Sequence, residues 1–148
     1  MSLPVGGCWV TSNPTAMPAL GIRYCDRTRY GVLANHVEAL MIVKASPEGY
    51  KKVLEGVTLK NLVHGEKTHL TQIKFKKGAV VPEHQHSQEQ TGYLISGSLR
   101  FFSGNEETIA LPGDSWTFAG GTPHGAEALE ASVVIELFSP VREDYLKL

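Results

Sequence analysis

From Met41 onward, short runs of alternating apolar and polar residues follow one another at close spacing, separated by turn-forming residues. The runs VTLKNLVH at 57–64 and HLTQIKFK at 69–76 have the period of two that places every second side chain on one face of a β-strand. The segments SWTFA at 115–119 and SVVIELF at 132–138 predict two further strands. Because no segment carries a helical stripe longer than about ten residues, the pattern favours an all-β sandwich or small barrel.

Turn signals separate these runs and predict how some of them connect. The residues GEKT between the first two runs form a turn, so His64 and His69 on its two sides are expected at the surface. The segments GYLIS at 92–96 and SLRFF at 98–102 flank Gly97, which predicts a β-hairpin.

The first 40 residues lack this periodicity. They contain both cysteines, Cys8 and Cys25, together with scattered Pro and Gly. We expect an N-terminal extension over residues 1–40 and one domain over residues 41–148, with Met41 as a candidate natural start. An extra strand or an arm that covers a sheet edge is the alternative for the extension. The cysteines are expected as free thiols in a reducing cytosol, with a single disulfide as the alternative.

Composition excludes several classes of function. The chain has 148 residues, of which 42% are hydrophobic and 20% charged, and its formal net charge is −1. This length suits one domain, and the near-neutral charge gives no basis for binding nucleic acid. No apolar stretch approaches the ~20 residues of a membrane-spanning helix, and the N-terminus lacks the basic start and apolar core of a secretory signal. We therefore expect a cytoplasmic protein without nucleic-acid or membrane partners.

Two histidines, His84 and His86, are separated by one residue in PEHQHSQEQ. Residues at this spacing point to the same face of a strand, so both imidazoles can reach one point. A third histidine, His124, lies in GGTPHG, and Gln90 offers an amide oxygen shortly after His86. Imidazole is a common ligand for divalent first-row metals, so a fold that joins these residues makes a metal site. An ordinary surface histidine pair is the alternative.

An acidic residue interrupts the last apolar run. In SVVIELF, Glu136 shares one strand face with Val134 and Phe138. A carboxylate among aliphatic residues is costly to bury unless it is paired, neutralised or near a cation. Glu136 is therefore a candidate acid/base group. The alternative is an ion pair with Arg142 or Arg100 that closes the barrel.

Two motifs of the chain resemble those of the cupin superfamily. The first cupin motif, G-x5-H-x-H-x3-E-x6-G, is matched by Gly78, His84, His86, Gln90 and Gly97, with Gln in the Glu position. The second, G-D-x4-P-x-G-x2-H-x3-N, is matched by Gly113, Asp114, Gly121 and His124, with Ala119 and Ala128 in the Pro and Asn positions. The resemblance covers residues 41–148 and implies a double-stranded β-helix, or jelly-roll barrel. It also implies one divalent transition metal (Ni, Zn, Mn or Fe) held at the barrel mouth by His84, His86, Gln90 and His124.

Within the cupins, the chain is similar to the KdgF family of pectin degradation proteins. The similarity lies in the tail VVIELFSPVREDYL at 133–146, in the opening of the module and in HSQEQTGYLISG. It implies an enzyme that converts ring-form 4,5-unsaturated uronates from pectin or alginate breakdown into linear keto forms. It also implies catalysis by Glu136 and Arg142 and substrate binding by Phe138 and Arg142. The family more often has Asp at the position of Glu136.

The implied mechanism separates the metal from the acid. Three imidazoles and an amide are all neutral, so the metal keeps its positive charge and remains a strong Lewis acid. Glu136 is expected to transfer protons, and Arg142 to hold the substrate carboxylate bidentately. Two other classes remain open: a metal-dependent dioxygenase of the quercetinase type and a non-catalytic sugar-binding sensor. Small cupins commonly pair through an exposed sheet face or edge, so a homodimer is expected.

Overall fold

The computed structural model describes residues 41–148, and Ala45–Leu148 form one compact unit. The predicted extension over residues 1–40, with Cys8 and Cys25, lies outside the described residues. The strands are β1 (Lys51–Leu54), β2 (Val57–His64), β3 (His69–Phe75), β4 (Val80–His84), β5 (Glu89–Ser96), β6 (Leu99–Ser103), β7 (Glu106–Ala110), β8 (Ser115–Phe118), β9 (His124–Ala128) and β10 (Ser132–Ser139). One short helix, α1 (Glu143–Leu146), follows them. No helix in the described part of the chain has the length and apolar character needed to cross a membrane.

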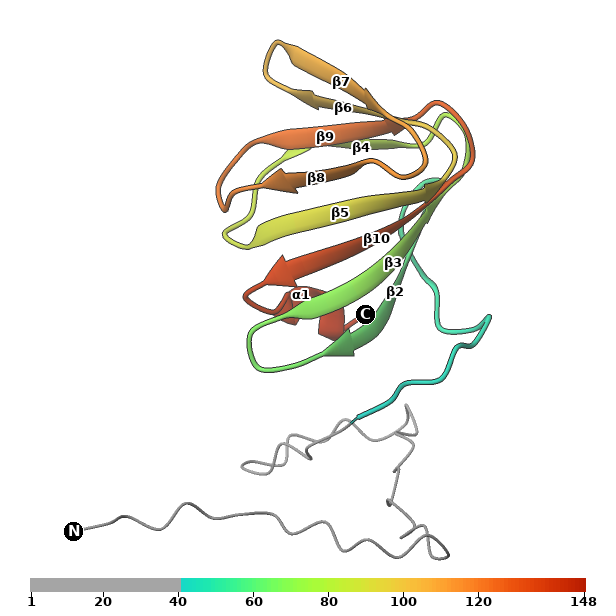
Figure 1. Cartoon of the computed structure of the whole chain (residues 1–148), viewed down its shortest axis with the longest axis vertical. Helices are drawn as coiled ribbons and strands as arrows, with labels where there is room; N and C mark the ends of the chain where they lie inside the picture. The colour runs from blue at the N-terminus through green and yellow to red at the C-terminus, as the bar shows by residue number, and fades with distance from the viewer. Residues whose placement is uncertain (1–40) are drawn as a thin grey trace, which may run out of the picture. The chain divides into compact units, whose positions relative to one another are not determined.

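The strands form two antiparallel sheets, one of six strands and one of four (Figure 1). The larger sheet has the order β1-β2-β3-β10-β5-β8, and the smaller has the order β4-β9-β6-β7. The predicted all-β class is therefore confirmed. Because β10 lies between β3 and β5, the last strand of the chain is hydrogen-bonded on both sides within the larger sheet.

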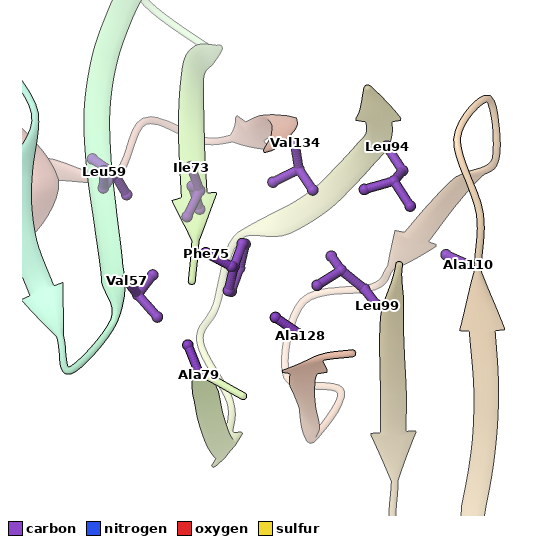
Figure 2. Packing of buried hydrophobic residues seen from close by; sticks show 10 residues of the cluster. All are labelled: Val57, Leu59, Ile73, Phe75, Ala79, Leu94, Leu99, Ala110, Ala128 and Val134. Atoms are coloured by element: carbon purple, nitrogen blue, oxygen red, sulfur yellow. The ribbon is translucent and has the colours of Figure 1, made fainter. Parts of the chain in front are cut away.

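The inward faces of the strands supply the hydrophobic core. In β10, buried positions alternate with more exposed ones, so Val134, Glu136 and Phe138 face inward as their spacing predicts. The buried apolar cluster draws on strands of both sheets and contains Val57, Leu59, Ile73, Phe75, Ala79, Leu94, Leu99, Ala110, Ala128 and Val134 (Figure 2). Burial of this apolar surface stabilises the fold by roughly 25 cal/mol per Å².

The predicted hairpin around Gly97 is wrong, because β5 and β6 belong to different sheets. β5 is hydrogen-bonded to β10 on one side and to β8 on the other, so it has no free edge for β6. Gly97 instead turns the chain from one sheet into the other with a φ of 92°. A Cβ at this position would lie 2.2 Å from the Ser132 Oγ, so glycine is required by both the backbone conformation and the space.

His69 is buried, which contradicts its expected place at the surface. It begins β3 on the same face as Thr71, and its ring centroid lies 6.5 Å from that of Phe138. Both ring nitrogens are buried without a hydrogen-bond partner among residues 41–148. Burial lowers the pKa of His69 to about 4, with smaller contributions from the charges of His64 and Arg142. The ring is therefore neutral at neutral pH.

We expect His69 to make the stability of the protein depend on pH. Its pKa is about 4 in the folded chain and near 6.5 in an unfolded one, so the unfolded state binds more protons between these values. The stabilisation is complete above about pH 6.5 and is lost as the pH falls toward the folded value. The free energy of unfolding can be measured with urea at about pH 7.5 and about pH 5. Between these two pH values it should fall by about 2 kcal/mol more in the wild type than in His69→Leu. Equal losses in the two proteins would contradict this expectation.

Candidate metal centre

Three histidines converge on a single point in the fold. His84 ends β4 and His124 begins β9, and the antiparallel pairing of these strands sets the two residues opposite each other. His86 follows in the connection to β5. The three residues offer ring nitrogens that all lie within 4.8 Å of one another. The fold therefore brings the predicted trio together as a group that can hold a metal ion.

Backbone carbonyl groups fix the orientation of all three imidazoles. Each Nδ1 lies near the carbonyl oxygen of a residue two positions away: 3.0 Å from Pro82 O for His84, 3.0 Å from Gln88 O for His86 and 2.8 Å from Thr122 O for His124. Because a carbonyl oxygen only accepts hydrogen bonds, each Nδ1 carries a proton, and in the neutral ring the lone pair is on Nε2. This arrangement prepares the three Nε2 atoms to bind a divalent cation.

Burial disfavours the protonation of two of these imidazoles, those of His86 and His124. His124 is 4% exposed, and its Nε2 is buried without a hydrogen-bond partner in the described part of the chain. Burial is the largest cause that lowers the pKa of both His86 and His124, so protonation of either ring is disfavoured. His84 is exposed, and the group is therefore open to solvent on one side.

Gln90 adds an amide oxygen to the histidine group. This residue lies on β5 and is 6% exposed. Its Oε1 is 3.0 Å from the His86 Nε2, and its Nε2 donates a hydrogen bond to the Glu136 Oε1 at 2.7 Å. With the His86 proton on Nδ1, both atoms of the 3.0 Å contact are acceptors, and a shared cation would satisfy both. The four predicted ligands therefore fit a divalent metal.

Glu136 lies next to Gln90, on the neighbouring strand. The pairing of β10 with β5 sets Gln90 opposite Phe138 and Glu136 opposite Gly92. Burial raises the pKa of Glu136 to about 7, against the lowering effects of the Gln90 hydrogen bond and the Arg142 charge. Such a carboxyl group can both accept and donate a proton near neutral pH. A cation held by the histidines would lower this pKa, because it favours the charged carboxylate.

The ion-pair alternative for Glu136 is wrong. Arg100 forms salt bridges with Glu107 and Glu127 on the neighbouring strands of the smaller sheet. Arg142 forms a salt bridge with Asp144 of α1. Among the described residues, the Glu136 carboxylate is therefore held by an uncharged amide and not by an arginine.

Arg142 and Phe138 lie in the C-terminal part of the chain, close to the histidines. The Arg142 Nε and Nη2 donate hydrogen bonds to the two carboxylate oxygens of Asp144 at 2.9 and 2.7 Å. Its guanidinium lies over the Tyr145 ring at 3.9 Å, and Phe138 packs edge-on against His86 at 5.7 Å. The buried Nη1 has no hydrogen-bond partner among residues 41–148. Sequence reasoning missed Asp144 and Tyr145, whose one signal was their position in the tail.

A cavity of about 370 Å³ opens beside His84, His124 and Glu136. The polar part of its wall is formed by His84, Gln90, His124, Glu136 and Tyr145. The apolar part includes Leu59, Phe75, Leu99 and Phe101. The volume lies within the range of roughly 300–1,000 Å³ for small-molecule sites, so the centre is placed to act on a bound small molecule.

Known proteins share this architecture. A family profile for the cupin domain matches residues 71–138. The solved structure of KdgF from Halomonas sp. is 36% identical, with a TM-score of 0.63, and the match covers 66% of this chain and 93% of that one. This chain is a cupin. The predicted resemblance to the cupins, and among them to KdgF, is confirmed.

Two curated relatives extend the comparison. The pectin degradation protein KdgF of Dickeya dadantii is 29% identical to this cupin over 99 residues, which cover 66% of this chain and 90% of that protein. The oxalate decarboxylase OxdC of Bacillus subtilis is 32% identical over 79 residues, which cover 50% of this chain and 20% of that enzyme. This cupin is therefore comparable with the KdgF proteins over nearly their whole length.

We expect this cupin to bind one divalent transition metal through the histidine group. His124→Ala removes a buried lone pair and should lower the affinity for Ni²⁺ or Zn²⁺ more than about 100-fold, since even changes behind the ligands cost roughly 10–100-fold. His64→Ala, which removes a histidine from β2, is the matched control and should keep the wild-type affinity. Calorimetric titration of the metal-free protein measures both. Equal metal affinities of the two variants would contradict metal binding by the histidine group.

Proposed function

We propose that this cupin linearises 4,5-unsaturated uronates released from pectin or alginate. The observation that carries the proposal is the cavity that Gln90 and Glu136 share with two of the histidines, in which a buried carboxyl group lies one hydrogen bond from a candidate metal ligand. The likeness to the KdgF proteins, of which the Dickeya relative is named a pectin degradation protein, supports a substrate derived from pectin.

The proposed reaction is an isomerisation that moves one proton. Loss of the proton from the hydroxyl on C1 allows the bond between C1 and the ring oxygen to break, which gives an aldehyde at C1. The electron pair of that bond leaves with the ring oxygen, which becomes the enolate oxygen on C5. Protonation at C4 then converts the C4=C5 double bond and its enolate into a ketone at C5. Because composition is unchanged, one carboxyl group that accepts and then returns a proton is sufficient.

Each residue of the proposed site has a distinct role in this reaction. Glu136 would carry the proton, because its carboxyl group lines the cavity. Asp144 already accepts hydrogen bonds from the Nε and Nη2 of Arg142. Arg142 would therefore bind the substrate carboxylate through Nη1. Phe138, which packs against both His86 and the Arg142 guanidinium, would border the sugar ring. A nickel, zinc, manganese or iron ion on the four ligands would supply Lewis acidity toward a substrate oxygen.

We expect Glu136→Gln to abolish turnover while preserving the shape of the site. Loss of a general acid/base group lowers the rate by about 10²–10⁴-fold. The measurement follows the absorbance of the conjugated alkene in unsaturated galacturonate and mannuronate. Glu89→Gln is the matched control, because Glu89 is exposed at the start of the same strand as Gln90 and should be dispensable. Arg142→Ala should chiefly raise KM, because it removes the proposed carboxylate donor.

The rate must be compared with the spontaneous decay of the substrate. Equal decay with the wild type, with Glu136→Gln and without protein would exclude uronate linearisation. Loss of turnover in the Glu89→Gln control would show that the assay reports general damage to the barrel.

A metal-dependent dioxygenase of the quercetinase type is the second candidate, and the apolar wall of the cavity favours it. Leu59, Phe75, Leu99 and Phe101 border a space that suits an aromatic ring better than a hydroxylated sugar. Oxygen consumption with a phenolic substrate would identify this activity. Uronate binding without turnover or oxygen uptake would identify a non-catalytic sugar sensor.

The homodimer is also a proposal. On the outer face of the larger sheet, Tyr93 and Ile95 of β5 and Leu137 of β10 are exposed, and this apolar strip supports the pairing of two copies. The cytoplasmic location, the lack of nucleic-acid or membrane partners and the division of the chain at residue 41 stay predictions.

A further inference from the structure

We infer that Glu136 positions Gln90, so that the oxygen of the amide and not its nitrogen faces the three histidines. The inference rests on the metal centre of the proposed function and is independent of the uronate reaction. A carboxamide has an accepting end and a donating end of nearly equal shape, and only the accepting end can bind a cation. The group that selects between the two ends therefore decides whether Gln90 is a ligand.

The backbone of Gln90 is held on both sides by neighbouring strands, so only the side chain is free to rotate. The residue pairs with Phe138 of β10 on one side and with Phe118 of β8 on the other, inside the larger sheet. The Thr117 hydroxyl donates a further hydrogen bond to the Gln90 main-chain oxygen at 3.3 Å. These backbone contacts do not fix the side-chain rotation that exchanges the amide oxygen and the amide nitrogen.

Glu136 settles that rotation. Its Oε1 lies 2.7 Å from the Gln90 nitrogen, and both side chains are 6% exposed, so water cannot readily replace this contact. The ionised carboxylate, which a bound cation would favour, only accepts hydrogen bonds, so the reversed amide would then set two oxygens against each other in a buried place. The observed orientation directs the Gln90 Oε1 to the His86 Nε2 at 3.0 Å.

The arrangement also relocates a negative charge. The first cupin motif has Glu at the position of Gln90, where a carboxylate would bind the metal directly. In this chain the carboxylate is on Glu136, one hydrogen bond behind the ligand. Glu136 can therefore hold the ligand with one oxygen and offer the other to the cavity.

Metal affinity of the full chain tests the inference, with Ni²⁺ or Zn²⁺ alone as the probe. Glu136→Leu removes the acceptor and should weaken binding about 10–100-fold, the usual effect of losing a group behind a ligand. Glu136→Gln keeps an accepting oxygen and should stay within about threefold of the wild type. Val134→Ala, which truncates a buried residue of the same strand, should leave the affinity unchanged and so controls for loosening of the barrel.

A double-mutant cycle keeps the result interpretable if single variants lose stability. In a Gln90→Leu background, Glu136→Leu should cause no further loss of affinity, because its effect passes through the amide. Equal losses in both backgrounds, or wild-type affinity in Glu136→Leu, would overturn the inference. A wild type that binds neither metal would overturn it as well. If the metal affinities are as predicted but no unsaturated uronate is turned over, the proposed function is rejected and this inference is supported.

Discussion

The position of β10 between β3 and β5 is the constraint on which the site depends. Hydrogen bonds to both neighbours hold the strand in register, so Glu136 cannot slide away from Gln90. A slip of one residue would turn Glu136 to the outer face and bring an apolar neighbour inward. The tail that carries Arg142 begins where β10 ends, so the same ladder positions the arginine. One strand therefore connects the candidate ligands, the buried acid and the candidate substrate donor.

The electrostatics of the centre follow from which groups are buried. Desolvation disfavours the protonation of His86 and His124, and Gln90 is neutral by nature. The negative charge that would compensate a cation is on Glu136, which burial makes costly to ionise. A bound metal and an ionised Glu136 would therefore stabilise each other, because the attraction between the two opposite charges offsets part of the free-energy cost of burying them. Ligand set and acid act as one electrostatic unit.

Sequence reasoning predicted the parts of the fold that depend on local geometry. Strands over 57–64 and 132–138 were predicted from alternation, and β2 and β10 occupy these positions. The hairpin at Gly97 was wrong because strand partners are chosen by non-local packing, and β5 already has two. His69 was wrongly placed at the surface because a residue beside a turn can still start a strand on its buried face.

The sequence by itself determined the spacing of the four candidate ligands and the inward face of Glu136, because both follow from the backbone period of a strand. The tertiary structure decided the partners: Gln90 for Glu136 and Asp144 for Arg142, and not the ion pair that was the alternative for Glu136. It also decided that Glu136 and three of the four candidate ligands line one cavity with an apolar wall. Contacts of this kind depend on the register of strands that are distant in the chain, and no local pattern encodes that register.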